Sequence, residues 1–188
     1  MATIIRTEAT PNPNALKFVL DATVLYSGSR SFNETAQAAG DPIASALFTI
    51  DGVTSVYYMK DFVTVTKDET RSWREIALKV YEQVPTLDLA ALVQEVEAVK
   101  QSSGHGDFDT LSQDDKLARI NEVLDRDIRP GLAMDGGGLQ IKALDGYRVS
   151  IHYQGACGSC PSSTAGTLRF IDTLLKEKVH ASIEVTPA

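Results

Sequence analysis

The residues best suited to chemistry in this sequence are its two cysteines, Cys157 and Cys160. Two residues, Gly158 and Ser159, separate them, so a turn can point both sulfurs at one metal ion or cluster. Thiolates are soft ligands that suit iron–sulfur clusters, zinc or Cu(I). Pro161 is expected at the first position of a helix, which places Cys160 near the helix N-terminus, where a thiolate is favoured over a thiol.

The residues around the pair favour a ligand-binding loop over the alternative of two small buried hydrophobic cysteines. Gly155 and Gly158 let the backbone turn sharply and approach a ligand closely. Because the chain has only two cysteines in 188 residues, a disulfide-stapled secreted scaffold is excluded. A metal site made of four cysteines from one chain is excluded for the same reason.

The cysteine count also constrains assembly. A 4Fe–4S cluster is held by four cysteine thiolates, and one chain offers two. Two copies that meet around a two-fold axis supply four from identical loops. If these cysteines bind such a cluster, the binding species is a homodimer, or the missing ligands come from elsewhere. A cluster bridging two subunits on an exposed loop is expected to be labile, which suits delivery better than electron transfer.

Two other functions use the same cysteines. In thioredoxin-like redox proteins, C-x-x-C follows the first strand of a βαβ unit, whereas here it is expected to follow a β-hairpin. A zinc-bridged structural dimer would use the same four sulfurs, and the sequence does not separate it from a cluster carrier. His152, on the preceding strand, is the imidazole best placed to join a metal site.

The elements expected around the cysteines form an α-β-β-α-β domain over residues 111–188. Its first helix is expected to end at Pro130-Gly131. Asp145-Gly146 between two alternating segments predicts a hairpin. The cysteine loop follows the hairpin and precedes the second helix, and residues 181–186 form a last strand. Asp135-Gly136-Gly137-Gly138 could approach the cysteine loop or a client, but it is more typical of a tight entry into the first strand, because glycine tolerates positive φ.

Residues 1–100 predict a second small domain, so the fold class is α+β with two domains joined by a Gly-, Ser- and Asp-rich linker at residues 101–110. Residues 27–40 are rich in small polar side chains and predict a loop. The remaining segments predict regular elements: strands at 3–7, 16–20, 53–59 and 62–66, and helices at 42–49, from Ser72 to Pro85, and at 87–100.

The charge balance limits the partners. The chain has 18 Lys and Arg against 25 Asp and Glu, a net charge of −7, with no basic stripe. This argues against nucleic acid and against an anionic membrane surface. The apolar runs are far shorter than the ~20 residues that span a bilayer. Neither a secretory signal nor a transit peptide is visible, so we expect a cytoplasmic, bacterial-type protein.

Two segments resemble one family. Residues 111–185 resemble the C-terminal domain of the NifU family, and residues 7–59 resemble the N-terminal domain of two-domain Nfu scaffold proteins. The segments that carry the resemblance are Gly155-Ala156-Cys157-Gly158-Ser159-Cys160-Pro161-Ser162-Ser163, Ile128-Arg129-Pro130, Asp135-Gly136-Gly137 and Thr10-Pro11-Asn12-Pro13-Asn14-Ala15-Leu16-Lys17-Phe18. The sequence departs from the family at Gly138, where members usually have an acidic residue, and over residues 81–110, where Pro85 interrupts an expected helix.

The resemblance implies a scaffold or carrier for a 4Fe–4S cluster rather than an enzyme. Cys157 and Cys160 would be the ligands, the cluster would be shared between two chains, and apo iron–sulfur proteins would receive it. Cluster-assembly factors would be the other partners. The first domain has no cysteine and no clustered histidine with carboxylates. We expect it to recognise clients or assembly factors, or to regulate the second domain.

Overall fold

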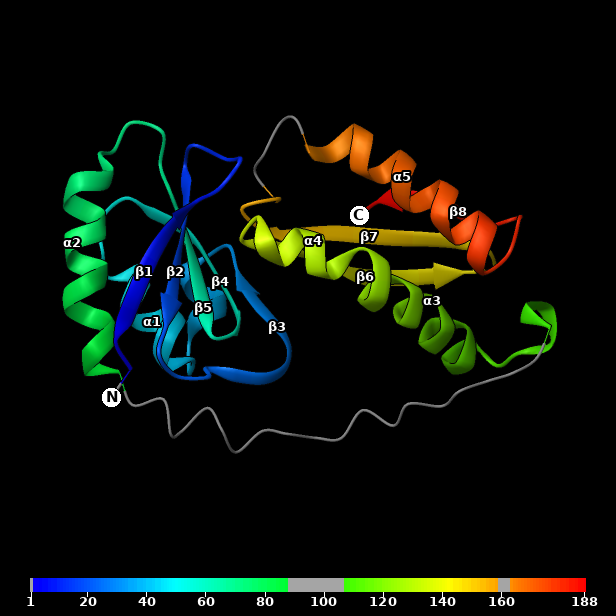
Figure 1. Cartoon of the computed structure of the whole chain (residues 1–188), viewed down its shortest axis with the longest axis horizontal. Helices are drawn as coiled ribbons and strands as arrows, with labels where there is room; N and C mark the ends of the chain where they lie inside the picture. Colours follow the sequence, from blue (N-terminus) through cyan, green and yellow to red (C-terminus); the bar gives the residue numbers. More distant parts are fainter. Residues whose placement is uncertain (1, 88–106, 159–162) are drawn as a thin grey trace.

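A computed structural model describes residues 2–87, 107–158 and 163–188, which form two α+β domains side by side (Figure 1). The expected α+β class is confirmed. The expected helix at 87–100 lies almost wholly outside the described residues, as does most of the expected linker. Phe108, within that linker, is only 2% exposed and packs in the core of the second domain. The packed part of the second domain therefore begins ahead of residue 111.

The first domain is built on a five-stranded antiparallel sheet in the order β1-β2-β5-β4-β3. Its strands are β1 (Ile4–Ala9), β2 (Ala15–Leu20), β3 (Leu25–Phe32), β4 (Val53–Lys60) and β5 (Phe62–Lys67). Its helices are α1 (Pro42–Phe48), α2 (Trp73–Gln83) and the short 3-10 helices η1 (Thr35–Ala38) and η2 (Val84–Thr86).

Both faces of this sheet are covered. On one face, Phe18, Tyr58 and Val65 pack with apolar residues of α1 and α2, such as Ile43 and Ile76. Since side chains alternate along a strand, their neighbours point to the opposite face. There a smaller cluster of Val19, Tyr57 and Phe62 contacts Ala133 of the second domain. The central strand β5 is accordingly buried at every position.

The second domain has a three-stranded sheet in the order β6-β7-β8, with β6 antiparallel and β8 parallel to β7. Its elements are η4 (Phe108–Thr110), α3 (Gln113–Asp127), α4 (Arg129–Met134), β6 (Gly137–Asp145), β7 (Arg148–Gly155), α5 (Ser163–Lys178) and β8 (Glu184–Pro187). Apolar residues of α3 and α5 pack on one face of the sheet against Leu139, Val149 and Ile151. The expected α-β-β-α-β order is confirmed, with α4 added.

Two local predictions were wrong. The segment expected as a loop from residue 27 contains most of β3, an edge strand that pairs only with β4 and therefore tolerates polar residues. Pro130 does not end the helix. The helix ends at Asp127, and Pro130 lies in the first turn of α4, where a missing N–H costs nothing.

Candidate functional site

Cys157 lies in a turn immediately after β7. The Gly158 N–H donates to the Gly155 carbonyl (3.0 Å), which closes the turn, and the Ala156 N–H donates to the Gly136 carbonyl (3.2 Å). The Cys157 side chain is only 6% exposed and packs with the core of the second domain. The expectation of a cysteine on an exposed loop is therefore wrong for Cys157, because this turn folds back against the start of β6.

Glycines make that close approach possible. Gly137 pairs with Gly155 across β6 and β7. A Cβ built at Gly137 would lie 2.5 Å from the Cys157 Sγ and 2.9 Å from the Cys157 backbone nitrogen. Gly155 has a φ of +62°, and a Cβ there would lie 2.7 Å from the Gly136 carbonyl oxygen. Glycine at both positions is thus a packing requirement of the cysteine turn.

The Asp135–Gly138 motif does more than enter a strand. Gly136 has a φ of +73°, which confirms the expected tight entry. Gly137 also lies against Cys157, so the motif forms one wall of the cysteine turn. The sequence favoured the strand entry over an approach to the cysteine loop, because the pairing of Gly137 with Gly155 is a contact between distant segments.

Arg129 anchors the same wall from the helical side. Its guanidinium donates to the Asp125 carboxylate (2.7 Å) and the Asn121 side-chain oxygen (2.8 Å), both on α3, and to the Leu139 carbonyl (3.4 Å) on β6. One residue therefore ties α3, α4 and β6 together. This explains the Ile128-Arg129-Pro130 motif without assigning it chemistry.

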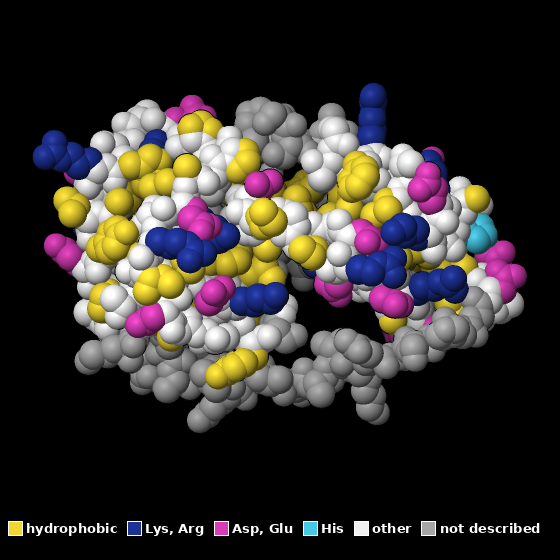
Figure 2. Space-filling view, in the orientation of Figure 1, with side chains coloured by type: hydrophobic (Ala, Val, Ile, Leu, Met, Phe, Trp, Pro, Cys, Tyr) yellow, Lys and Arg dark blue, Asp and Glu magenta, His cyan; other side chains and the backbone are white. Residues whose placement is uncertain are grey.

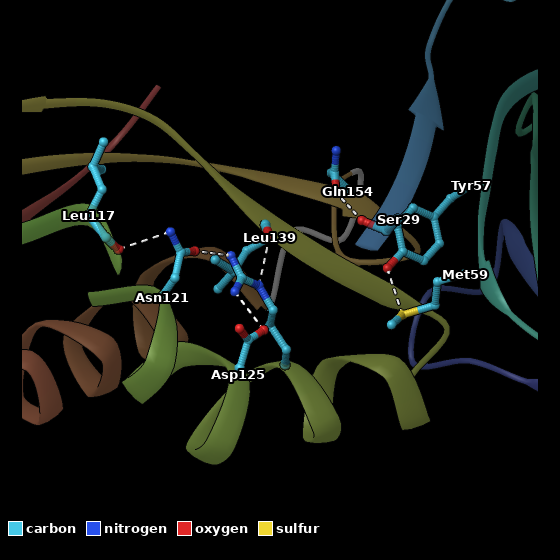
Figure 3. Close-up of polar contacts among 9 residues, drawn as sticks. Ser29, Tyr57, Met59, Leu117, Asn121, Asp125, Leu139 and Gln154 are labelled. Atoms are coloured by element: carbon cyan, nitrogen blue, oxygen red, sulfur yellow. Dashed lines mark hydrogen bonds and ion pairs between the residues drawn. The ribbon is translucent and has the colours of Figure 1, made fainter. Parts of the chain in front are cut away.

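Two tyrosines near the turn were not found from the sequence. The Tyr153 hydroxyl is buried without a hydrogen bond in the described part of the chain, and burial raises the pKa of Tyr153 to about 12. Burial likewise raises the pKa of Tyr57, from the first domain, to about 12. The Tyr57 hydroxyl donates to the Met59 sulfur at 3.2 Å (Figure 3). No local pattern marks either tyrosine, because each is placed by tertiary packing.

The structure describes only some of the remaining predicted site residues. Ser159, Cys160 and Pro161 lie outside the described residues. Gly158 is exposed at the end of the turn. His152 is half-buried, and strand alternation places it on the face opposite Ile151 and Tyr153. Among the described residues, which do not include Cys160, no three His, Cys, Asp or Glu side chains gather as a metal site.

Comparison with known proteins identifies the family of this chain. Residues 5–87 match the family described as scaffold protein Nfu/NifU N terminal, and residues 120–186 match the NifU-like domain. A NifU-like protein of Schizosaccharomyces pombe is 34% identical over 181 residues, which cover 93% of this chain and 68% of that protein. The chain belongs to the Nfu/NifU-like scaffold family.

A human relative is similar to this Nfu/NifU-like chain over most of its length. The human protein named NFU1 iron-sulfur cluster scaffold homolog, mitochondrial, is 35% identical over 173 residues, or 92% of this chain. The chain spans 66% of the length of that relative. A solved NifU-like protein from Saccharomyces cerevisiae is 27% identical and covers 45% of this chain and 77% of its own, with a TM-score of 0.41.

The compartment of this Nfu/NifU-like chain stays a prediction. Its human and Arabidopsis thaliana relatives are named as mitochondrial proteins, which does not support the expected cytoplasmic location. Among the described helices, none combines the length and apolar composition needed to cross a membrane.

Proposed function

We propose that this chain is a carrier of an iron–sulfur cluster, with Cys157 and Cys160 as its ligands, and not an enzyme. The observation that carries the proposal is the Cys157 turn, in which the absence of side chains at Gly137 and Gly155 makes room for Cys157 beside the start of β6. The family adds support, since the human relative is named as an iron–sulfur cluster scaffold homolog. Gly155, Gly158, Ser159 and Pro161 form the supporting loop in this proposal.

The proposed cargo is a 4Fe–4S cluster shared between two chains. Four thiolates hold such a cluster, and each chain contributes two. The loaded species is then a homodimer with a two-fold axis through the cluster. Because the Cys157 side chain is buried in the single chain, loading requires this turn to open.

The proposed partners are the proteins at either end of delivery. Assembly factors would supply the cluster, and apo iron–sulfur proteins would receive it. Neither nucleic acid nor a membrane is a proposed partner. On the face shown in Figure 2, Lys and Arg side chains are interspersed with Asp and Glu, so no surface of one sign is presented there.

Anaerobic reconstitution with iron and sulfide tests this function. We expect the wild-type chain to give a brown product with about two irons per chain that runs as a dimer, since four irons are shared by two chains. Cys157→Ala should stay colourless. His152→Ala is the matched control and should load like the wild type, because His152 lies on the other face of the sheet. A colourless wild-type monomer, or a dimer that takes up only zinc, would contradict the proposal.

Thiol–disulfide exchange is the second candidate, and one observation favours it. Although the cysteines follow the β6–β7 hairpin, as expected, β7 also pairs in parallel with β8, and α5 connects these two strands. β7, α5 and β8 therefore form a βαβ unit, and the cysteine segment lies between its first strand and its helix. Sequence did not reveal this, since nothing local sets the pairing direction of β8. The burial of Cys157 opposes exchange, which needs an accessible thiolate. Cys160→Ser should accumulate mixed disulfides with substrates only if exchange is the function.

A further inference from the structure

The Pro11-Asn12-Pro13-Asn14 turn has no role in cluster binding as proposed so far, yet the structure places it against the cysteine turn. The Asn12 side chain is only 3% exposed. Its Nδ2 donates to the carbonyl of Ala156 at 3.2 Å, across the two domains. Ala156 directly precedes Cys157. One hydrogen bond therefore connects the first domain to the backbone that holds the candidate ligand.

Asn12 is itself held in place by its own turn. Its Oδ1 accepts from the Asn14 N–H at 2.9 Å, and its backbone N–H donates to the Thr10 hydroxyl at 3.2 Å. The side-chain oxygen is thus used inside the first domain and the side-chain nitrogen is directed to the second. Only an amide side chain of this length provides both an acceptor and a donor at these positions.

Tyr57 makes a second contact with the same turn. A Cβ built at Gly155 would lie 2.8 Å from the Tyr57 Cδ1, and one built at Gly138 would overlap the Tyr57 hydroxyl. The ring therefore fills the space above two glycines that flank the cysteine turn. A side chain at position 138 would occupy the same volume, so the glycine found here is what admits the ring.

Lys17 makes the third contact. Its Nζ donates to the carbonyls of Ala133 (3.1 Å) and Met134 (3.4 Å) at the end of α4, just before the glycine motif. Its side chain is 11% exposed and also pairs with Glu8 at 3.0 Å. A cation at the C-terminus of a helix stabilises the last carbonyls. The first domain thus contacts both chain segments that enclose Cys157.

We infer that the first domain restrains the cysteine turn, and that Asn12 and Tyr57 are positioning residues which keep Cys157 buried. The consequence for loading rests on the proposed function, but the restraint belongs to the chain without a cluster. Release of the Asn12 and Tyr57 contacts would free the Ala156–Cys157 backbone to turn outward. The inference gives the expected regulatory role of the first domain a structural basis.

The alkylation rate of Cys157 tests the restraint. The full-length chain carries Cys160→Ala, so that Cys157 is its one thiol, and is treated with iodoacetamide at a single pH under reducing conditions. Asn12→Asp keeps the Oδ1 acceptor of the turn but replaces the donor to Ala156 with an oxygen. We expect alkylation about fivefold faster, which corresponds to about 1 kcal/mol of opening free energy and to one lost hydrogen bond.

Asn14→Asp is the matched control. It introduces the same charge in the same turn, while Asn14 Oδ1 accepts from Lys67 within the first domain (2.9 Å). We expect an alkylation rate within about twofold of the parent, and equal rates for the Asn12→Asp and Asn14→Asp chains would overturn the inference. Added negative charge near a thiol slows alkylation by favouring the protonated form, so faster reaction reports opening rather than charge.

Local opening must be separated from global unfolding. Opening of the turn exposes little surface, so the faster rate in Asn12→Asp should not change with urea below the unfolding transition. A rate that rises steeply with urea would overturn the inference. If Asn12→Asp does not fold, the alkylation rate of Cys157 in a Gly138→Asp chain tests the restraint on its own. It places a side chain in the volume that the Tyr57 ring occupies, and an unchanged alkylation rate would contradict the restraint.

The two proposals fail separately. Alkylation uses the chain without iron or sulfide, whereas reconstitution compares wild type with Cys157→Ala. A chain that loads a cluster but shows no effect of Asn12→Asp retains the proposed function and loses the restraint. A chain that fails to load but shows the fivefold effect retains the restraint and loses the proposed function.

Discussion

Replacement of Gly137 by alanine tests the packing of the cysteine turn. A Cβ at this position would meet three atoms within 3.0 Å, namely the Cys157 sulfur, the Gln154 carbonyl oxygen and the Cys157 nitrogen. Two of these belong to the backbone, so they cannot rotate away. Overpacking of a well-packed site lowers the free energy of unfolding by about 1–3 kcal/mol. Because backbone atoms are in contact here, we expect Gly137→Ala to lower it by about 2–3 kcal/mol.

The assay is thermal unfolding followed by far-ultraviolet circular dichroism. A loss of about 2 kcal/mol lowers the Tm of a domain of this size by about 8–16 °C. Trp73 is the single tryptophan and lies on α2, so its fluorescence follows the first domain separately. Because the substitution lies in the second domain, the circular dichroism transition should move more than the fluorescence transition.

Gly131→Ala is the control for the effect of adding a methyl group. Gly131 lies on α4, and a Cβ there would have no atom within 4 Å. Alanine should therefore raise stability by about 0.5–1 kcal/mol through helix propensity. If Gly137→Ala melts at the same temperature as Gly131→Ala, the cysteine turn is not packed against β6 as described.

Two further predictions concern groups near the turn. Tyr153→Phe removes a buried hydroxyl that makes no hydrogen bond to any described residue, so denaturant unfolding should show stability unchanged or raised by about 1 kcal/mol. A loss of more than 1 kcal/mol would mean that the hydroxyl has a partner. Burial, and next the nearby Lys142, lower the pKa of His152 from its ordinary 6.5. The unfolded chain then binds this proton more readily than the folded chain, so stability falls as the pH drops below about 6.5 and is constant above it. His152→Gln should remove this part of the pH dependence, and an unchanged profile would show that other groups cause it.

Local chemistry made several elements predictable. The helix expected at 42–49 is α1, and its start is set by the Asp41 carboxylate, which accepts from the Ala44 N–H at 2.8 Å as an N-cap does. Asp145-Gly146 predicted the β6–β7 turn, where Gly146 has a φ of +58°. In both cases, a few adjacent residues set the backbone conformation.

What the sequence did not reveal depends on contacts between distant segments. The Ser-rich strand β3 reads as a loop because an edge strand needs few apolar residues. The burial of Cys157 depends on Gly137, about 20 residues earlier, and the partner of Asn12 is 144 residues away. The spacing of the cysteines indicated their chemistry, but not their surroundings.

The fit of the Tyr57 ring over Gly138 ties two positions in different domains to each other. A side chain at position 138 and a tyrosine at position 57 compete for the same volume, so neither can change freely while the other stays. A chimera that takes its second domain from a relative with an acidic residue at this position would meet a steric conflict at the junction. The two domains of this chain are therefore not interchangeable modules. A domain exchange that preserves the fit would have to transfer the residues at positions 57 and 138 together.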